Sequence, residues 1–402
     1  MKPGRGTVYD IYRKNKDDVK ALLLGRYPRS VYLRINELQR GEIPVFVLHS
    51  VQPDKFEAQL QYLVENQYRT VMANELGDLV TGAKTAGERI VALTFDDGRG
   101  SLWSIAYPLL KKYGLSAISF IVPGQIKQTT TRLPNLEDVW NDRADLQQVC
   151  NRENMELLCT WNEIQEMHRS GTIDFQSHTS YHHSVFYTDH FVDFVNPDFK
   201  PAFLKGTCYI PVHQGGRDVF PSAPEWGRPI FRWAPAMAVE KRFLEDEDLS
   251  QHCMEYVRDN GDLDFFKQRD WRRFLKARFR QYIRRYGRSG HFQTPSERIN
   301  DLRYDLSCSK EMIEAKLRKQ VRHLCYPWYQ GSKTAVQISK EVGYRANYWG
   351  ILGRDTVNWA GRTDPFHLVR INADYIFSLP GKGRQSIHQI IVGKIKVRAK
   401  GV

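Results

Sequence analysis

The sequence predicts an α/β fold with a mostly parallel sheet, and three observations indicate it. Short apolar runs alternate with amphipathic stretches at the interval typical of β–α units. One apolar run, 91–95, stops at Asp96 and Asp97, and a second, 173–177, leads into a cluster of histidines. Because parallel strands of α/β folds present their carboxyl ends at one edge, we expect an active site where these two runs end.

The individual elements follow one another as strands and helices along the first part of the chain. The segment 44–48 is expected to form a strand that ends at His49, and 56–66 has the spacing of an amphipathic helix. We further expect a short strand at 68–71, a helix at 101–113 and a strand at 117–122.

The side chains at these strand ends suit a metal site. Two adjacent carboxylates, Asp96 and Asp97, are costly unless they share a cation or a proton. His178 and His182 are four residues apart, so a helical turn would place both imidazoles on one face. With one carboxylate they would give three ligands to a zinc-like ion and leave a position for water. Alone, an Asp-Asp-Gly turn or a histidine pair on a helix surface would be unremarkable, but their joint occurrence favours a metal site.

Two motifs carry a resemblance to a known family. The run from Thr94 to Gly98, Thr-Phe-Asp-Asp-Gly, and the run from Ser177 to His182, Ser-His-Thr-x-x-His, resemble the first two motifs of the NodB-type polysaccharide deacetylases. The resemblance covers about 43–184 and resumes at about 303–380. It implies a distorted, incomplete (β/α) barrel that binds a divalent metal, expected to be zinc.

The resemblance also implies roles for the motif residues. Asp96 would be the general base, and Asp97 would bind the metal together with His178 and His182. A carboxylate on the metal is a poor proton acceptor, whereas its neighbour can take a proton from the attacking water. His183 follows immediately and is an alternative ligand, although the family spacing favours His182.

The family's third motif has a variant at 324–329, which the helical segment 309–314 precedes. Pro327 has no N–H, so the backbone of Trp328 would stabilise the oxyanion, and the rings of Trp328 and Tyr329 would form a platform for a sugar. Both rings could equally belong to the core. Many family members have an arginine two residues before the proline that orders the base, but this chain has Cys325 there.

The catalytic acid is assigned to His49. The C-terminal Leu-x-His motif of many family members has no clean counterpart, because His388 lies in a basic tail. His49 resembles the N-terminal histidine of the biofilm poly-N-acetylglucosamine deacetylases, in which the motif order is permuted. A histidine can protonate a leaving amine at physiological pH, although a hydrogen-bonded histidine at a strand end is the alternative.

The segment 185–301 separates the second motif from the third, and it is expected to be an inserted lid or cap subdomain. It should begin as loops and become helical at 240–249 and 264–286. The last helix has an aromatic stripe among basic residues. That pattern fits either simple packing or a basic face for an anionic membrane surface or a pyrophosphate-linked glycan. The predicted domains are a basic extension at 1–41, a catalytic domain at 42–184 and 302–380, the insertion, and a basic tail at 381–402.

Composition agrees with a globular enzyme. The chain has 402 residues, 41% of them hydrophobic, a net charge of +13 and six cysteines at irregular spacing, which we expect to be reduced. No signal peptide or long apolar window is present, which predicts a cytoplasmic protein, with membrane-surface association as the variant. No nucleic-acid-binding signature accompanies the charge, so nucleic acid is not expected as a partner.

The sequence therefore predicts a metal-dependent hydrolase that removes N-acetyl groups from an amino-sugar glycan, or from a lipid- or nucleotide-linked precursor, and releases acetate. Two alternatives remain: a hydrolase of cyclic amides or ureides on the same fold, and a glycan-binding descendant without catalysis. The intact Asp97, His178 and His182 set argues against the first, and Asp96 argues against the second.

Overall fold

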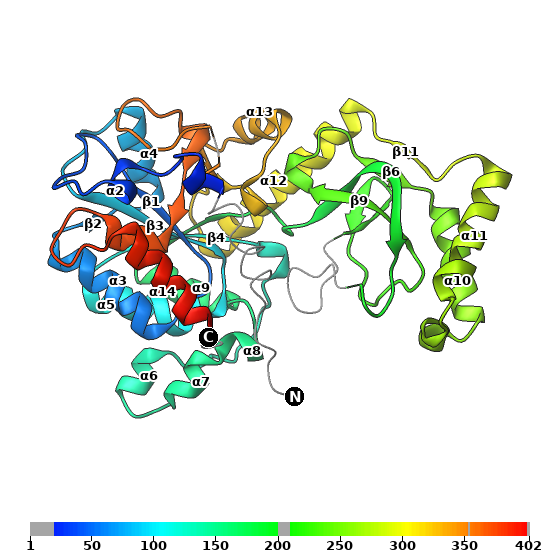
Figure 1. Cartoon of the computed structure of the whole chain (residues 1–402), viewed down its shortest axis with the longest axis horizontal. Coiled ribbons are helices and arrows are strands. Elements are labelled where there is room, and N and C mark those ends of the chain that lie inside the picture. The colour runs from blue at the N-terminus through cyan, green and yellow to red at the C-terminus, as the bar shows by residue number, and fades with distance from the viewer. Residues whose placement is uncertain (1–19, 200–209, 353, 400–402) are drawn as a thin grey trace. The chain divides into compact units, whose positions relative to one another are not determined.

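The structure is a computed structural model that describes residues 20–199, 210–352 and 354–399. Its contacts divide the chain into two compact units (Figure 1). The barrel unit comprises Met1–Ser180, Cys308–Tyr329 and Gly343–Val402, and the inserted unit comprises Tyr181–Ser307 and Gln330–Val342. Of the predicted extension at 1–41, residues 1–19 lie outside the described part, as do 400–402 of the predicted tail.

A nine-stranded sheet forms the centre of the barrel unit, and every neighbouring pair in it is parallel. Its main path runs in the order β14-β13-β12-β5-β4-β3-β1-β15, and β2 pairs with β3. The strands are β1 (Val45–Leu48), β2 (Arg69–Thr70), β3 (Ile90–Asp97), β4 (Ala117–Ile121), β5 (Ile173–Ser177), β12 (His323–Cys325), β13 (Ala346–Trp349), β14 (Leu368–Val369) and β15 (Ile371–Asn372).

The two ends of this strand order meet through the chain itself. β14 and β15 stand at opposite ends of the path, yet only Arg370 separates them in sequence. The Asn358 side chain reinforces the junction, since it donates to the Val369 carbonyl at 2.8 Å and accepts from the Val369 N–H at 2.9 Å. The sheet therefore curls into a barrel that no backbone ladder closes, which confirms the incomplete (β/α) barrel.

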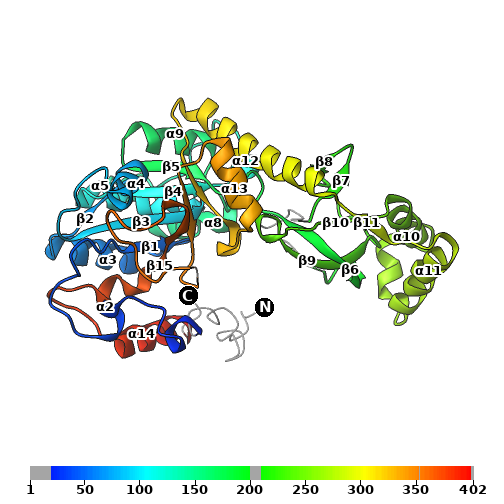
Figure 2. The same cartoon turned by 90° about the horizontal axis from the view of Figure 1, so that it is seen from above.

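Helices cover the outer side of the sheet (Figures 1 and 2). The predicted helices correspond to α3 (Pro53–Glu65) and to a π-helical turn, Leu102–Ala106, that continues as α5 (Tyr107–Tyr113). The other long helices of this unit are α4 (Ala73–Thr81), α9 (Trp161–Arg169) and α14 (Ile387–Ala399). The short ones are α2 (Arg29–Tyr32), α6 (Leu136–Trp140), α7 (Leu146–Cys150) and α8 (Arg152–Met155).

Local chemistry explains where helices begin. At α9 the Thr160 hydroxyl accepts from the Glu163 N–H, and the Glu163 carboxylate accepts from the Thr160 N–H, which is a capping box.

None of the helices in the described part is long and apolar enough to cross a membrane. The described cysteines are all free thiols, as expected: Cys150, Cys159, Cys253, Cys308 and Cys325.

The inserted unit is built from three antiparallel strand pairs and a helical pair. The strand pairs are β6 (Ser184–Phe194) with β9 (Pro229–Pro235), β7 (Val212–Gln214) with β8 (Arg217–Val219), and β10 (Phe243–Glu245) with β11 (Gly290–Phe292). The helices are α10 (Glu247–Asp259) and α11 (Trp271–Tyr286), and α13 (Lys333–Val342) also belongs to this unit. The long helix α12 (Pro295–Leu317) begins here and continues into the barrel unit.

Two expectations for this segment were wrong. Its first part is not simply loops, because β6 and β9 pair around buried Phe186 and Phe231. The helix expected from 240 begins only at Glu247, since 243–245 form a strand and the Asp246 carboxylate then caps the helix by accepting from the Leu249 N–H at 3.1 Å.

The aromatic stripe of α11 packs into the inserted unit. Trp271, Leu275 and Tyr282 are buried in a cluster that also contains α10 residues, and α10 and α11 lie side by side in both views. Tyr286 is the exception, because it is 53% exposed. Packing therefore accounts for most of the stripe, while the basic side chains lie outside it.

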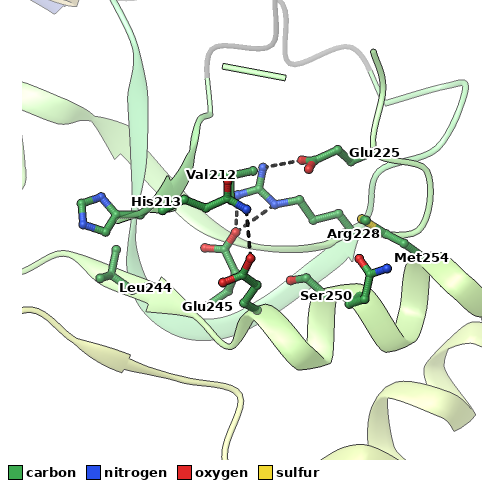
Figure 3. A pocket seen from close by; sticks show the side chains of 11 residues that line it. Val212, His213, Glu225, Arg228, Leu244, Glu245, Ser250 and Met254 are labelled. Carbon is green, nitrogen blue, oxygen red and sulfur yellow. Dashed lines mark hydrogen bonds and ion pairs between the residues drawn. The ribbon is translucent and has the colours of Figure 1, made fainter. Parts of the chain in front are cut away.

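Buried Arg228 connects several segments of the inserted unit through hydrogen bonds (Figure 3). The Arg228 guanidinium donates to Glu225 at 3.0 Å, to Glu245 at 2.9 Å and to the Pro211 carbonyl at 2.9 Å. The labelled His213 ring points away from this cluster. Glu225, Arg228 and Glu245, here named the Arg228 cluster, thus satisfy one another.

Candidate active site

The strand β3 ends in the aspartate pair, and both side chains are buried. Asp97 has the left-handed φ of 71°, and Gly98 follows with φ of 73°. A Cβ at Gly98 would lie 2.9 Å from Cγ2 of Ile121, so only glycine fits this turn without a shift. The turn is tight because the neighbouring strand β4 passes directly beside it.

Asp97, His178 and His182 form a group suited to a metal. Each offers one ligand atom, and these atoms lie within 4.8 Å of one another and are all buried. His178 Nδ1 lies 2.8 Å from the Cys325 carbonyl, which fixes the N–H on Nδ1 and leaves Nε2, 3.6 Å from Asp97 Oδ1, as the ligand nitrogen. Burial lowers the pKa of His178, against the opposing pull of Asp96 and Asp97, so the neutral, metal-binding form is favoured.

This donor set fits the expected metal. One carboxylate and two neutral imidazoles are ligands typical of a catalytic zinc site, which keeps its fourth position open. The expected helical turn between the histidines is wrong, however. Thr179 and His182 both have left-handed φ values, 65° and 52°, so bends rather than one helix face bring the imidazoles together.

His183 does not share this group. Its Nε2 lies 3.1 Å from Asp218 Oδ2, and its Nδ1 lies 3.6 Å from Asp305 Oδ2, within the inserted unit. Among the described residues, the candidate metal group contains His182 and not His183, so the geometry favours His182, and its role as a ligand stays a prediction.

Asp96 has a partner that sequence reasoning missed. The Arg370 guanidinium donates to the two Asp96 oxygens at 2.6 and 2.8 Å, and both side chains are buried. Burial raises the pKa of Asp96, but Arg370, His178 and His49 outweigh it and hold the pKa below its usual range. Asp96 is therefore a carboxylate at neutral pH, the form that a general base requires.

Cys325 lies against the same arginine. Its Sγ is 2.9 Å from an Arg370 nitrogen and 3.7 Å from each Asp96 oxygen. Asp96, His178 and Cys325 also lie close enough to hold a metal, but the Arg370 cation already occupies that side. Burial raises the pKa of the Cys325 thiol well above its usual value, which makes it a poor ligand.

His49 leaves the sheet beside the aspartate pair. The register pairs Leu48 with Phe95, so the next residues on these parallel strands, His49 and Asp96, emerge side by side. His49 is exposed, and its charge is among the causes that lower the pKa of Asp96. It borders a cavity of about 290 Å³ that Lys55, Gln59, Asn372 and Asp374 also line.

Trp328 and Tyr329 form a turn after β12. Both have left-handed φ values, 51° and 62°, and the Tyr329 N–H donates to the Tyr326 carbonyl at 3.0 Å. The Tyr329 ring packs over Arg370, 5.3 Å from its guanidinium carbon, and Gly350 leaves room for it. Tyr329 therefore supports Arg370, while Trp328 is partly exposed and its oxyanion role stays a prediction.

One sequence signal could have revealed Arg370. It interrupts the apolar run Leu368, Val369 and Ile371, where a charged residue would otherwise be unexpected. Position 325, where many family members have an arginine, is a cysteine in this chain. The third motif therefore provides no cation for Asp96. A buried charge needs a partner of opposite charge, and neither Arg370 nor Asp96 has one nearby in the sequence. The two could therefore be expected to pair with each other.

Parts of the chain are similar to known proteins. Residues 83–196 match the family model of polysaccharide deacetylases. The Bacillus subtilis (strain 168) protein YxkH is 31% identical over 117 residues, 27% of this chain and 42% of that protein. The poly-β-1,6-N-acetyl-D-glucosamine N-deacetylase of Escherichia coli (strain K12) is 27% identical over 130 residues, 32% of this chain and 18% of that protein.

A solved structure of a de-N-acetylase from Aggregatibacter actinomycetemcomitans aligns with 83% of this chain and 95% of its own, at 17% identity and a TM-score of 0.48. The chain spans less than half the length of the two curated relatives. The matched segment contains β3 with Asp96 and Asp97 and continues through His178 and His182. Over this segment the chain is similar to the polysaccharide deacetylase family.

Proposed function

We propose that the protein is a metal-dependent N-deacetylase of an amino-sugar glycan. One observation carries this proposal: a buried group of one carboxylate and two imidazoles adjoins a second carboxylate that is held ionised. A metal site beside a separate base is what hydrolysis of an unactivated amide requires.

The residues divide the chemistry as follows. When bound by Asp97, His178 and His182, a divalent ion such as zinc would polarise the acetamide carbonyl and lower the pKa of a water. Asp96 takes a proton from the attacking water as its oxygen bonds to the carbonyl carbon. The Trp328 N–H donates to the resulting oxyanion. His49 gives a proton to the nitrogen as the C–N bond breaks, which leaves acetate and a free amine.

The proposed substrate class is based on the substrate of a related protein. The E. coli protein is named for poly-β-1,6-N-acetyl-D-glucosamine, and we propose an N-acetylated glycan or a lipid- or nucleotide-linked precursor of one for this chain. The cavity beside His49 has groups that can bond to hydroxyls, among them Gln59 and Asn372.

The test is an acetate-release assay on a panel of N-acetylated glycans, from monosaccharides to polymers, with and without a chelator. We expect acetate release that the chelator abolishes and added zinc restores. Chelator-insensitive hydrolysis of a cyclic amide or ureide would replace the proposal with the first alternative. Glycan binding without acetate release would replace it with the second.

A second part of the proposal concerns α11 and an anionic membrane surface. The helix has seven Lys or Arg residues and no Asp or Glu among its 16 residues. Arg273, Arg280 and Arg284 are exposed and recur on one face, and Phe274 is 44% exposed. Clusters of this size attract anionic lipid with about 1 kcal/mol per cation near the surface.

Vesicle co-sedimentation checks this surface. We expect binding to vesicles that contain phosphatidylserine but not to neutral vesicles, and weakening at high salt. Changing Arg273, Arg280 and Arg284 to Gln should weaken binding by about 100-fold, since three charges contribute about 3 kcal/mol. The matched control changes Arg40, Lys333 and Arg345 to Gln, three exposed cations elsewhere. Equal loss in both variants would reduce the effect to net charge, and equal binding to both vesicles would end the proposal.

A further inference from the structure

The histidine that follows the ligand His182 lies in a buried network of charges. His183 is 5% exposed, and its two ring nitrogens face Asp218 at 3.1 Å and Asp305 at 3.6 Å. The Phe220 ring packs edge-on against it, with centroids 5.6 Å apart. The imidazole is thus fixed in position and in rotation.

Asp218 is itself held from three sides. Arg242 donates to both of its oxygens, at 3.0 and 2.5 Å, and His213 Nδ1 lies 3.1 Å from Oδ1. Arg242 also donates to Asp301 at 2.9 Å and is only 3% exposed. Asp218 is therefore a rigid acceptor for His183, because Arg242 is anchored in turn on α12.

The backbone around His182 needs such an anchor. His182 adopts a left-handed conformation that is unfavourable for a side chain with a Cβ, as does Thr179 three residues earlier. Such conformations persist where the surrounding structure holds them. After His182, the His183 carbonyl accepts from the Ala236 N–H at 3.0 Å, and β6 begins at Ser184.

Burying this many charges is costly, and a network of this kind is weak evidence for stability as such. Such a network can instead serve to hold the backbone in one conformation, which would offset the cost of burying its charges. The Arg228 cluster of the same unit is a second group of buried ion pairs (Figure 3). It does not include His183, so it serves as a comparison.

We propose that His183 is a positioning residue, whose contact with Asp218 fixes the backbone that presents His182 to the metal. This inference rests on the metal site of the proposed function.

The experiment measures the zinc Kd of the full chain by competition with a chromogenic chelator, before any assay of activity. His183→Gln and Asp218→Asn should each raise the Kd by about 10-fold or more, the scale known for residues that orient metal ligands. Thermal unfolding of the metal-free proteins measures the stability that each variant loses.

Two controls separate positioning from general damage. His213→Gln removes the other imidazole from Asp218 and leaves the residue next to His182 in place, so its zinc Kd should stay within about twofold of the wild type. Glu245→Gln breaks a buried ion pair of the Arg228 cluster in the same unit and should also leave the Kd unchanged. If Asp218→Asn does not fold, the pair His183→Gln and His213→Gln carries the test.

The outcomes distinguish the two proposals. A wild-type chain that binds no zinc would overturn the proposed function, and this inference with it. A wild-type chain that binds zinc, with variants at 183 and 218 that bind it equally well, would overturn this inference alone. So would a loss of affinity in His213→Gln or Glu245→Gln as large as in His183→Gln.

Discussion

The barrel unit and the inserted unit both bury arginine–carboxylate pairs, but they use them differently. In the inserted unit, Arg228 is surrounded by Glu225, Glu245 and a backbone carbonyl, so the cluster is complete in itself. In the barrel unit, Arg370 and Asp96 pair beside Asp97, His178 and His182, a group whose ligand atoms lie close enough to hold a metal, although Asp97 Oδ2 also accepts from Arg99 Nε at 2.8 Å. The difference teaches that burial of charge alone does not indicate an active site. What indicates it is a buried pair next to ligands that the pair does not consume.

The largest expected effect separates the two aspartates of the barrel unit. Asp96→Asn should lower turnover by about 10²- to 10⁴-fold, because the general base is lost, while zinc still binds. Asp97→Asn should lose both turnover and zinc, since it removes a ligand. Acetate release and zinc content per chain measure the two effects, and Glu225→Gln in the Arg228 cluster should change neither. An Asp96→Asn variant with near-normal turnover would remove Asp96 as the base.

The next effect is on the free energy of unfolding, when the buried arginine of each unit is replaced. Arg370→Met leaves the buried Asp96 without its cation, so the free energy of unfolding in urea should fall by about 3–5 kcal/mol. Arg228→Met should cost less, about 1–3 kcal/mol, because Glu225 is partly exposed and can reach water. Equal losses in the two variants would contradict the difference between the units.

A smaller effect is the loss of stability at acidic pH that His323 causes. Burial lowers the pKa of His323 from 6.5 to about 4, and Tyr348 and Asn74 flank its ring. Between these values the unfolded chain binds a proton that the folded chain does not, so stability falls as pH falls from 6.5 towards 4. The contribution is about 2–3 kcal/mol.

His323→Gln provides the measurement. The difference in unfolding free energy between wild type and variant should shrink by this amount between pH 7 and pH 4.5, whereas other groups titrate equally in both proteins. Unfolding curves that stay parallel over that range would show that the His323 imidazole does not resist protonation.

The smallest effect belongs to an exposed ion pair of the inserted unit. Lys267 and Asp264 lie 2.6 Å apart, with side chains 79% and 74% exposed. Lys267→Ala should change the free energy of unfolding by less than about 0.5 kcal/mol, since water screens the pair. A loss comparable to that of Arg228→Met would mean that exposure does not decide the strength of these pairs.

The sequence predicted those parts of the site that lie within one strand and its turn. β3 with Asp96 and Asp97, and β5 leading to His178, follow from apolar runs that stop at polar residues. The turn between His178 and His182 was not predictable, because left-handed φ values at Thr179 and His182 leave no mark in side-chain periodicity. The register shifts of β6 likewise hid a strand in a segment expected to be loops.

Long-range pairs were harder to predict: Arg370 is conspicuous within an apolar run, but the sequence does not state which residue it contacts. Asp96 and Arg370 are 274 residues apart, and nothing local to either names the other. The same holds for His183 and Asp218, because His183 precedes β6, which pairs with β9, whereas Asp218 lies on β8, which pairs with β7. The compact units also give α13 to the inserted unit, although it follows the third motif in the chain.

The junction between β14 and β15 has a consequence for biosynthesis. As the ribosome produces the chain from its N-terminus, Asp96 emerges long before the guanidinium that neutralises its surroundings. Nascent chains that stop short of position 370 therefore contain both aspartates, His178 and His182, but their sheet is unfinished and the Asp96 carboxylate lacks its counter-ion. Completion of the last strands and arrival of the Asp96 counter-ion coincide in one residue, so the buried carboxylate is neutralised only as the barrel is completed.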